Sequence, residues 1–148
     1  PYAGASGRTL RGWLARAGFD EGALHGRFYL TSLTKCFPGA STSGKGDRAP
    51  SAAEVALCRA HLDRELALVR PELVLALGKL SAAAFLGPAP LAELVGTLRP
   101  AERAGHRFLV LSLPHPSGVS RWLNDPANRE RHAAALALLS EERARRGL

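Results

Sequence analysis

Apolar residues recur at helical spacing near the start of the chain. Leu10, Trp13, Leu14 and Ala17 fall on one face of a helix. Gly18 follows directly, at a position where glycine commonly ends a helix. The pattern predicts an amphipathic helix that lays one face against a core.

The middle of the chain predicts a second, longer helix. Ser51 and Glu54 have the spacing of a capping box, and Pro71 ends the helical pattern. The apolar stripe between them consists of Val55, Cys58, Leu62, Leu66 and Val69. The stripe predicts that one side of this helix is buried.

Two further helices are expected. Gly78 turns the chain into a short helix that contains Phe85. Asp125 and Pro126 suit the N-cap and the first position of a long final helix. Its inward-facing residues are expected to include Leu136 and Leu139.

Three apolar runs predict strands. Residues 27–33 (RFYLTSL) are rich in β-branched and aromatic residues. Residues 72–77 (ELVLAL) form an unalternating run, which is typical of a strand covered on both faces, and residues 107–113 (RFLVLSL) form a third strand. Because strands alternate with helices, we expect one α/β domain over residues 1–148, with three α/β/α layers and a short parallel sheet.

The composition is that of a globular protein, and its basic charge leaves two interpretations: a polyanionic partner, or a basic protein without such a partner. Hydrophobic residues make up 46% and charged residues 22%, and no apolar run is long enough to cross a bilayer. No signal peptide is visible, so we expect a cytoplasmic protein with reduced cysteines and no membrane partner. The net charge of +7 favours a polyanion such as nucleic acid. The chain has no Met and starts within a domain pattern, so we expect the domain to be incomplete at its N-terminus.

Two polar clusters follow the first and the last predicted strand. One contains Thr31, Ser32, Lys35 and Cys36, and the other spans residues 115–121. Ligands of parallel α/β sheets bind beyond the carboxyl ends of the strands. The two clusters therefore predict a site at one edge of the sheet.

The residues after the last strand could carry chemistry. Two prolines flank His115 and hold its imidazole stiffly. Small residues with hydroxyls and accessible amides, which suit phosphate oxygens, follow at Ser117, Gly118 and Ser120. Val119 is an apolar residue in a tight loop and could wedge into a base stack. The alternative is a proline-rich turn with a surface histidine.

The run HPSGVSR at residues 115–121 resembles the second signature of the uracil-DNA glycosylase superfamily. Its residue pattern is most similar to that of the mismatch-specific branch, which has Asn where this chain has His115. Three other segments are similar, in order, to segments of the iron–sulfur (family 4-like) branch: residues 1–7 (PYAGASG), 29–36 (YLTSLTKC) and 50–58 (PSAAEVALC). The resemblance covers nearly the whole chain and implies a glycosylase that flips a base out of DNA.

The resemblance also implies roles for single residues. Tyr2 would stack on the flipped base, Ser32 would read its edge, and His115 would donate a hydrogen bond to uracil O2 as the base leaves with negative charge. Val119 would fill the gap left in the helix. Residues that would hold the DNA backbone are Ser6, Ser117, Gly118, Ser120 and Arg121.

Two departures from the family pattern bear on activity. Ser32 stands where the family commonly has Asn, and one hydroxyl cannot make the paired contacts of an amide. Either weaker discrimination between bases or low activity is therefore expected. The first signature, a glycine-rich loop that places the attacking water, would lie just before Pro1. We therefore expect the natural polypeptide, and the water-activating residue, to extend upstream.

The third departure concerns metal. Cys36 and Cys58 match the third and fourth ligands of the 4Fe–4S cluster of the iron–sulfur branch, and the other two cysteines are expected upstream of Pro1. Two alternatives stay open. The cysteines could be core thiols, or Cys58 and His61 could belong to a zinc site that lacks further partners.

The leading hypothesis is a monomeric DNA-repair glycosylase that hydrolyses the N-glycosidic bond of uracil, and of other deaminated bases. The alternative is a catalytically weak relative that binds damaged DNA. A variant of the first has His115 attack the sugar and leave a covalent adduct. A Ser-His hydrolase is disfavoured because no nucleophile elbow or acidic partner is apparent.

Overall fold

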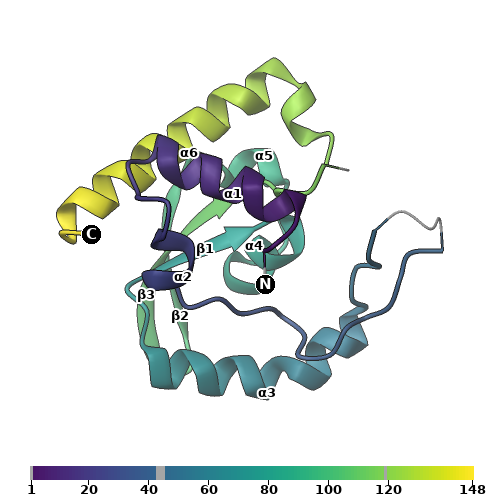
Figure 1. Ribbon diagram of the computed structural model, residues 1–148. Helices are drawn as coiled ribbons and strands as arrows, with labels where there is room; N and C mark the ends of the chain where they lie inside the picture. Colours follow the sequence, from purple (N-terminus) through teal and green to yellow (C-terminus); the bar gives the residue numbers. More distant parts are fainter. Residues whose placement is uncertain (1, 43–45, 119) are drawn as a thin grey trace.

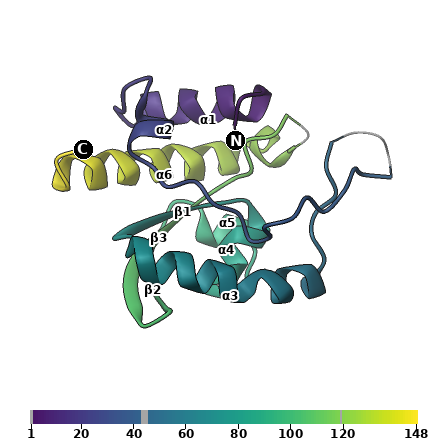
Figure 2. The same cartoon turned by 60° about the horizontal axis from the view of Figure 1, so that its bottom comes forward.

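The computed structural model describes residues 2–42, 46–118 and 120–148. Three layers are visible in Figures 1 and 2: α1 and α6 on one side, a small sheet in the middle, and α3 on the other side. The elements in chain order are α1 (Ala5–Arg16), α2 (Ala23–Gly26), α3 (Ala52–Val69), β1 (Leu73–Leu77), α4 (Lys79–Leu86), α5 (Leu91–Leu94), β2 (Leu98–Arg103), β3 (His106–Leu113), the 3-10 turn η1 (Trp122–Asn124) and α6 (Pro126–Arg145).

The sheet described by the structure has the strand order β1-β3-β2. Strand β1 runs parallel to β3, from Leu73 opposite Leu109 to Leu77 opposite Leu113. Strand β2 pairs antiparallel with β3. The predicted α/β class is confirmed, and the sheet is mixed because a hairpin adds an antiparallel edge.

This β2–β3 hairpin is not part of the sequence prediction. Its two-residue turn, Ala104 and Gly105, has φ angles of 54° and 69°, and positive φ at both positions is typical of a type I′ turn. Alanine is not a usual residue for such a turn, so the sequence signal is weak. Pro100 lies in β2, which the edge position allows.

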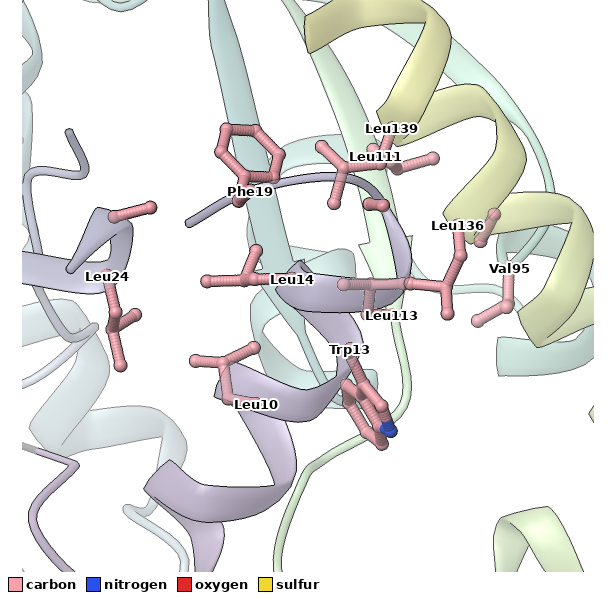
Figure 3. Packing of buried hydrophobic residues seen from close by; sticks show 13 residues of the cluster. Leu10, Trp13, Leu14, Phe19, Leu24, Val95, Leu111, Leu113, Leu136 and Leu139 are labelled. Carbon is pink, nitrogen blue, oxygen red and sulfur yellow. The ribbon is translucent and has the colours of Figure 1, made fainter. Parts of the chain in front are cut away.

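The two faces of β3 build two separate cores. Leu111 and Leu113 are fully buried against α1 and α6, where Figure 3 shows them beside Leu14 and Leu136. Phe108 and Val110 belong instead to a cluster with residues of α4 and α5. Because successive side chains of a strand point to opposite faces, this one strand contributes to both cores.

The N-terminal caps of α3 and α6 form as the sequence predicts. Ser51 Oγ accepts from the Glu54 N–H at 3.2 Å, and the Ser51 N–H donates to Glu54 Oε2 at 2.7 Å, which completes the capping box of α3. Asp125 caps α6 by accepting from the Ala127 N–H at 2.8 Å, with Pro126 at the first helical position.

Helix α3 contacts its surroundings through ion pairs and through two buried leucines. Asp63 binds Arg103 of β2 at 2.5 Å, and Glu65 binds Lys35 at 2.7 Å. Its buried residues Leu62 and Leu66 belong to neither of the two core clusters. The apolar stripe of this helix therefore does not pack directly into either core.

The predicted strand at residues 27–33 is wrong. Helix α2 ends at Gly26. Residues 28–33 then pass between the α1–α6 layer and α3 without pairing as a strand (Figures 1 and 2). A strand needs a hydrogen-bonded neighbour, and no strand among the described residues lies beside this segment.

The edge of β1 that faces away from β3 is also unpaired among the described strands. The Leu109 N–H donates to the Glu72 carbonyl at 2.9 Å, and the Gly78 N–H donates to the Leu113 carbonyl at 2.8 Å. Since hydrogen-bonding direction alternates along a strand, the backbone groups of Leu73, Leu75 and Leu77 point to the opposite edge.

Candidate base-binding groove

A groove of about 1210 Å³ separates β1 from α3 and from residues 27–34. Its walls are mostly leucines and aromatic side chains, with polar groups gathered at the carboxyl ends of β1 and β3. Apolar residues that line it include Leu14, Phe19, Leu24, Phe28, Leu30, Leu62, Leu66, Leu75, Leu77 and Leu139.

The structure brings five of the predicted site residues to this one groove. Tyr2, Ser6, Ser32, His115 and Ser117 all line it, although more than eighty positions separate Ser32 from His115 in the sequence. The parallel pairing of β1 with β3 explains the position of His115 and Ser117, because the ends of these strands open toward the same edge. The other three residues come from the chain up to the start of α1 and from the segment between α2 and α3.

His115 stands directly beyond the end of β3. The flanking Pro114 and Pro116 are fully buried, while the imidazole itself is exposed to the groove. The Ser117 N–H donates to His115 Nδ1 at 3.2 Å, and burial lowers the pKa of His115 below its ordinary value of 6.5. The ring is therefore neutral at pH 7, with Nδ1 as an acceptor, so the proton resides on Nε2.

Gly78 supports the histidine from the end of β1. Its φ of +86° and ψ of 168° define a conformation that is essentially restricted to glycine. A Cβ atom on Gly78 would lie 3.2 Å from His115 Cβ and 3.4 Å from its Cδ2. From the sequence, Gly78 was predicted only as a turn. A glycine directly after a buried strand can also indicate that another residue approaches the backbone closely.

Tyr2 is held at the groove by the first helix. Its φ is +60°, and its carbonyl accepts from Arg11 Nη1 at 3.2 Å. A Cβ atom on Gly7 would lie only 1.6 Å from that carbonyl oxygen. Burial raises the pKa of the half-buried Tyr2 phenol, so the ring is neutral.

Ser32 lies in a segment fixed by Lys35 and Glu65. The ammonium of Lys35 donates to Thr31 Oγ1 and Glu65 Oε2, each at 2.7 Å, and to the Ser32 carbonyl at 3.0 Å. Thr31 Oγ1 in turn donates to Glu65 Oε2 at 2.5 Å, and the Ser32 hydroxyl donates to the Thr34 carbonyl.

This polar network lowers the pKa of Glu65. Partial burial acts to raise the pKa of Glu65, but hydrogen bonds from Lys35 and Thr31 and the charge of Lys35 outweigh it, so the pKa is lowered. Sequence reasoning missed Glu65, which looked like one more polar residue of α3.

The remaining residues of the HPSGVSR run form a turn beside the groove. The Ser120 N–H donates to the Ser117 carbonyl at 3.0 Å, Gly118 is exposed, and Arg121 is exposed at the start of η1. Gly118, Ser120 and Arg121 follow the groove-lining Ser117 in the chain but do not line the groove themselves. Val119, predicted to fill the helix gap, lies outside the described residues.

The two cysteines are close in the fold. Cys36 is exposed and Cys58 is half-buried on α3, and the N–H of Lys35 donates to Cys58 Sγ at 3.3 Å. Within residues 2–42, 46–118 and 120–148, no group of three or more His, Cys, Asp and Glu side chains could hold a metal ion. Exposure of these thiols disfavours the alternative of two core cysteines.

Among the described residues, no helix is both long and apolar enough to cross a membrane.

Residues 1–139 match the family model of the uracil DNA glycosylase superfamily, and the chain belongs to this superfamily. Two curated relatives narrow the likeness to one kind of member, since each is named a type-4 uracil-DNA glycosylase. The relative from Archaeoglobus fulgidus is 27% identical over 146 residues, which are 95% of this chain and 67% of the relative. The relative from Pyrobaculum aerophilum is 32% identical over 105 residues, which are 71% of this chain and 44% of the relative.

These comparisons confirm the family inferred from the residue motifs and agree with the family 4-like branch. The chain spans about two thirds of one relative and less than half of the other. The comparisons do not test the resemblance of the HPSGVSR loop to the mismatch-specific branch.

Proposed function

We propose that the chain is the greater part of a DNA-repair glycosylase that extrudes uracil from DNA and hydrolyses its N-glycosidic bond. The observation that carries the proposal is His115, a neutral imidazole with its proton on Nε2 at the mouth of an apolar groove that also contains Tyr2 and Ser32. Base flipping requires such a pocket, because the target atoms are inaccessible inside the duplex.

The chemistry follows from the developing charge. When the bond to the sugar breaks, the pyrimidine departs with negative charge on its O2 oxygen. An Nε2–H held in place beforehand stabilises that anion without reorganisation, and one such donor is typically worth about 2.7–4 kcal/mol. The aromatic face of Tyr2 would stack on the extruded base.

The rim of the groove would hold the DNA backbone. Ser6 and Ser117 line the groove, and Gly118, Ser120 and Arg121 continue along the turn beside it. Small residues give phosphate oxygens access to backbone amides, and the guanidinium of Arg121 can bind phosphate in a bidentate manner. The net charge of +7 would draw DNA to the protein.

The cysteines fit part of a cluster site. A 4Fe–4S cluster requires four thiolates, and Cys36 and Cys58 would supply two of them from a loop and a helix that already touch through Lys35. The other two cysteines would come from residues upstream of Pro1. A bound cluster would supply a rigid link between the loop and α3, outside the groove chemistry described above.

Residues upstream of Pro1 would also complete the groove. The unpaired edge of β1 and the unpaired segment 28–33 both border the same space. An added strand there would satisfy both sets of backbone groups and fill the apolar part of the groove between them, leaving its polar end, with Tyr2, Ser32 and His115, for the base. We expect the loop that follows this strand to carry the water-activating residue.

The decisive experiment uses the natural full-length protein with single- and double-stranded oligonucleotides that contain uracil, hypoxanthine or no lesion. Strand breaks after alkali report excision, and we expect them with uracil. His115→Ala should lower excision about 10²- to 10³-fold without weakening DNA binding. Binding without alkali-labile sites would select the alternative of a damaged-DNA-binding relative, and an adduct that survives denaturation would show attack by His115.

A further inference from the structure

We propose that Lys35 and Glu65 act as a positioning clamp that presents Ser32 to a flipped base as a hydrogen-bond acceptor only, so that Ser32 distinguishes deaminated bases from their parent bases. This inference rests on the proposed glycosylase function and adds the class of substrate that the groove accepts. It follows from the hydrogen bonds of residues 31–35.

The hydroxyl hydrogen of Ser32 is already used. The Ser32 Oγ donates to the carbonyl of Thr34, two residues further along the same turn. A serine hydroxyl has one hydrogen and two lone pairs, so the oxygen keeps only acceptor capacity toward the groove that it lines.

The clamp prevents the turn from rearranging. All three ammonium hydrogens of Lys35 have an acceptor, namely Thr31 Oγ1, the Ser32 carbonyl and Glu65 Oε2. The pair Lys35–Glu65 has side chains that are only 25% and 27% exposed, so the interaction is screened less than an open surface pair. Since one of these bonds ends on the Ser32 backbone, the ion pair fixes Ser32 itself to α3.

An acceptor at this place has a chemical consequence. Cytosine and adenine each carry a lone pair on the ring nitrogen of their pairing edge, N3 and N1 respectively. Deamination converts cytosine to uracil and adenine to hypoxanthine, and in both products that nitrogen carries a hydrogen. Ser32 Oγ can therefore accept from uracil N3–H and from hypoxanthine N1–H, whereas it faces a lone pair in either parent base.

Ser32 can make only one kind of hydrogen bond with the base, as an acceptor. Ser32 donates nothing to the exocyclic oxygen beside that N–H, so it provides no means to prefer uracil over hypoxanthine. Thymine and guanine carry the same ring N–H, and their exclusion must come from the shape of the groove and from base pairing. The inferred substrate class is thus the deamination products of both cytosine and adenine.

The test measures kcat and KM of the full-length protein on single-stranded oligonucleotides with one uracil, hypoxanthine, cytosine or adenine. We expect excision of uracil and hypoxanthine and none of cytosine or adenine. Ser32→Ala should lower kcat/KM about tenfold for both excised bases, and Ser32→Thr, which keeps the hydroxyl, should stay within about threefold of the wild type.

The clamp has its own readout. Lys35→Met and Glu65→Gln should each lower kcat for both bases while KM for the oligonucleotide stays unchanged, because they displace Ser32 and not the DNA backbone. The matched control is the ion pair Arg107–Glu102, which joins exposed side chains away from the groove at 2.8 Å. Arg107→Met and Glu102→Gln should change neither constant, and circular dichroism should show all variants folded.

The outcomes separate the two proposals. Excision of uracil without hypoxanthine, a Ser32→Ala variant as active as the wild type, or clamp variants that act only through KM would overturn the inference and leave the glycosylase function standing. A wild-type protein that binds DNA and excises none of the four bases would overturn both.

Discussion

The side chain of His115 lies against Gly78, at the point where the ends of two neighbouring parallel strands meet. A methyl group on Gly78 would come within 3.2 Å of His115 Cβ, which is closer than most such contacts. The backbone of β1 thus forms one wall of the seat in which the imidazole lies.

Gly78→Ala is therefore expected to displace His115 and to lower kcat/KM at least about tenfold. The substitution also strains the backbone by about 1–3 kcal/mol, because alanine rarely adopts this conformation. Gly87→Ala is the matched control, since Gly87 has nearly the same angles (φ 83°, ψ 170°) but open space within 4 Å of the place that its methyl group would occupy. Equal activity loss in both variants would show that strain alone, and not the contact with His115, is responsible.

Gly7→Ala is expected to dislodge Tyr2. The added Cβ would collide with the Tyr2 carbonyl oxygen at 1.6 Å, so the N-terminal residues must move away from the groove. Excision of uracil should fall, although helix propensity alone favours alanine over glycine by about 1 kcal/mol. Gly12→Ala in the same helix, with open space around it, should keep activity and raise the free energy of unfolding.

Acid is expected to destabilise the fold through His132. This side chain is only 3% exposed, packs edge-on against Trp13 at 4.5 Å, and has a pKa lowered to about 4 by burial and by the charge of Arg16. The unfolded chain, with a pKa of about 6.5, binds the proton first, so the neutral ring stabilises the fold above pH 6.5 and this contribution is lost as the pH falls toward 4. The full loss amounts to about 3 kcal/mol.

Urea unfolding between pH 4.5 and 8 measures this dependence. His132→Leu should flatten the curve between pH 6.5 and 4.5, whereas His25→Gln, at an exposed position, should leave its slope unchanged. A variant at position 132 with the same slope as the wild type would assign the acid sensitivity to other groups.

Arg121→Ala is expected to weaken DNA binding without regard to the base. Loss of one phosphate contact should reduce the slope of log K against log salt by about 0.9. Arg107→Ala, which changes an exposed arginine on the β2–β3 hairpin, is the control and should leave that slope within error. Fluorescence anisotropy over a range of salt concentrations provides the measurement.

The parts of the fold that were predictable have local causes. The capping box of Ser51 and Glu54 and the N-cap Asp125 act within three residues, so their helices could be placed from sequence alone. Strands β1 and β3 were predictable because β3 is buried over most of its length and β1 is at least half-buried on both faces, so both consist mainly of apolar residues.

The errors have non-local causes. Residues 27–33 have strand composition but no strand beside them in the described chain, and composition cannot reveal a missing neighbour. Strand β2 depends on its pairing with β3 and contains Pro100, which argues against a strand anywhere but at an edge. In the groove, Tyr2, Ser32 and His115 were found by motif, whereas Glu65 and Gly78 matter only because of what they touch in space.

The ionic attachment of α3 makes its local stability depend on salt. Amide hydrogens of this helix should exchange with solvent before those of α1 and α6, because local opening breaks charged contacts at Asp63 and Glu65 without disrupting either core cluster. Rising ionic strength should widen the difference in exchange rates between the layers. The ion pairs at Asp63 and Glu65 thus link the attachment of the groove wall that holds Ser32 to the ionic strength of the surroundings.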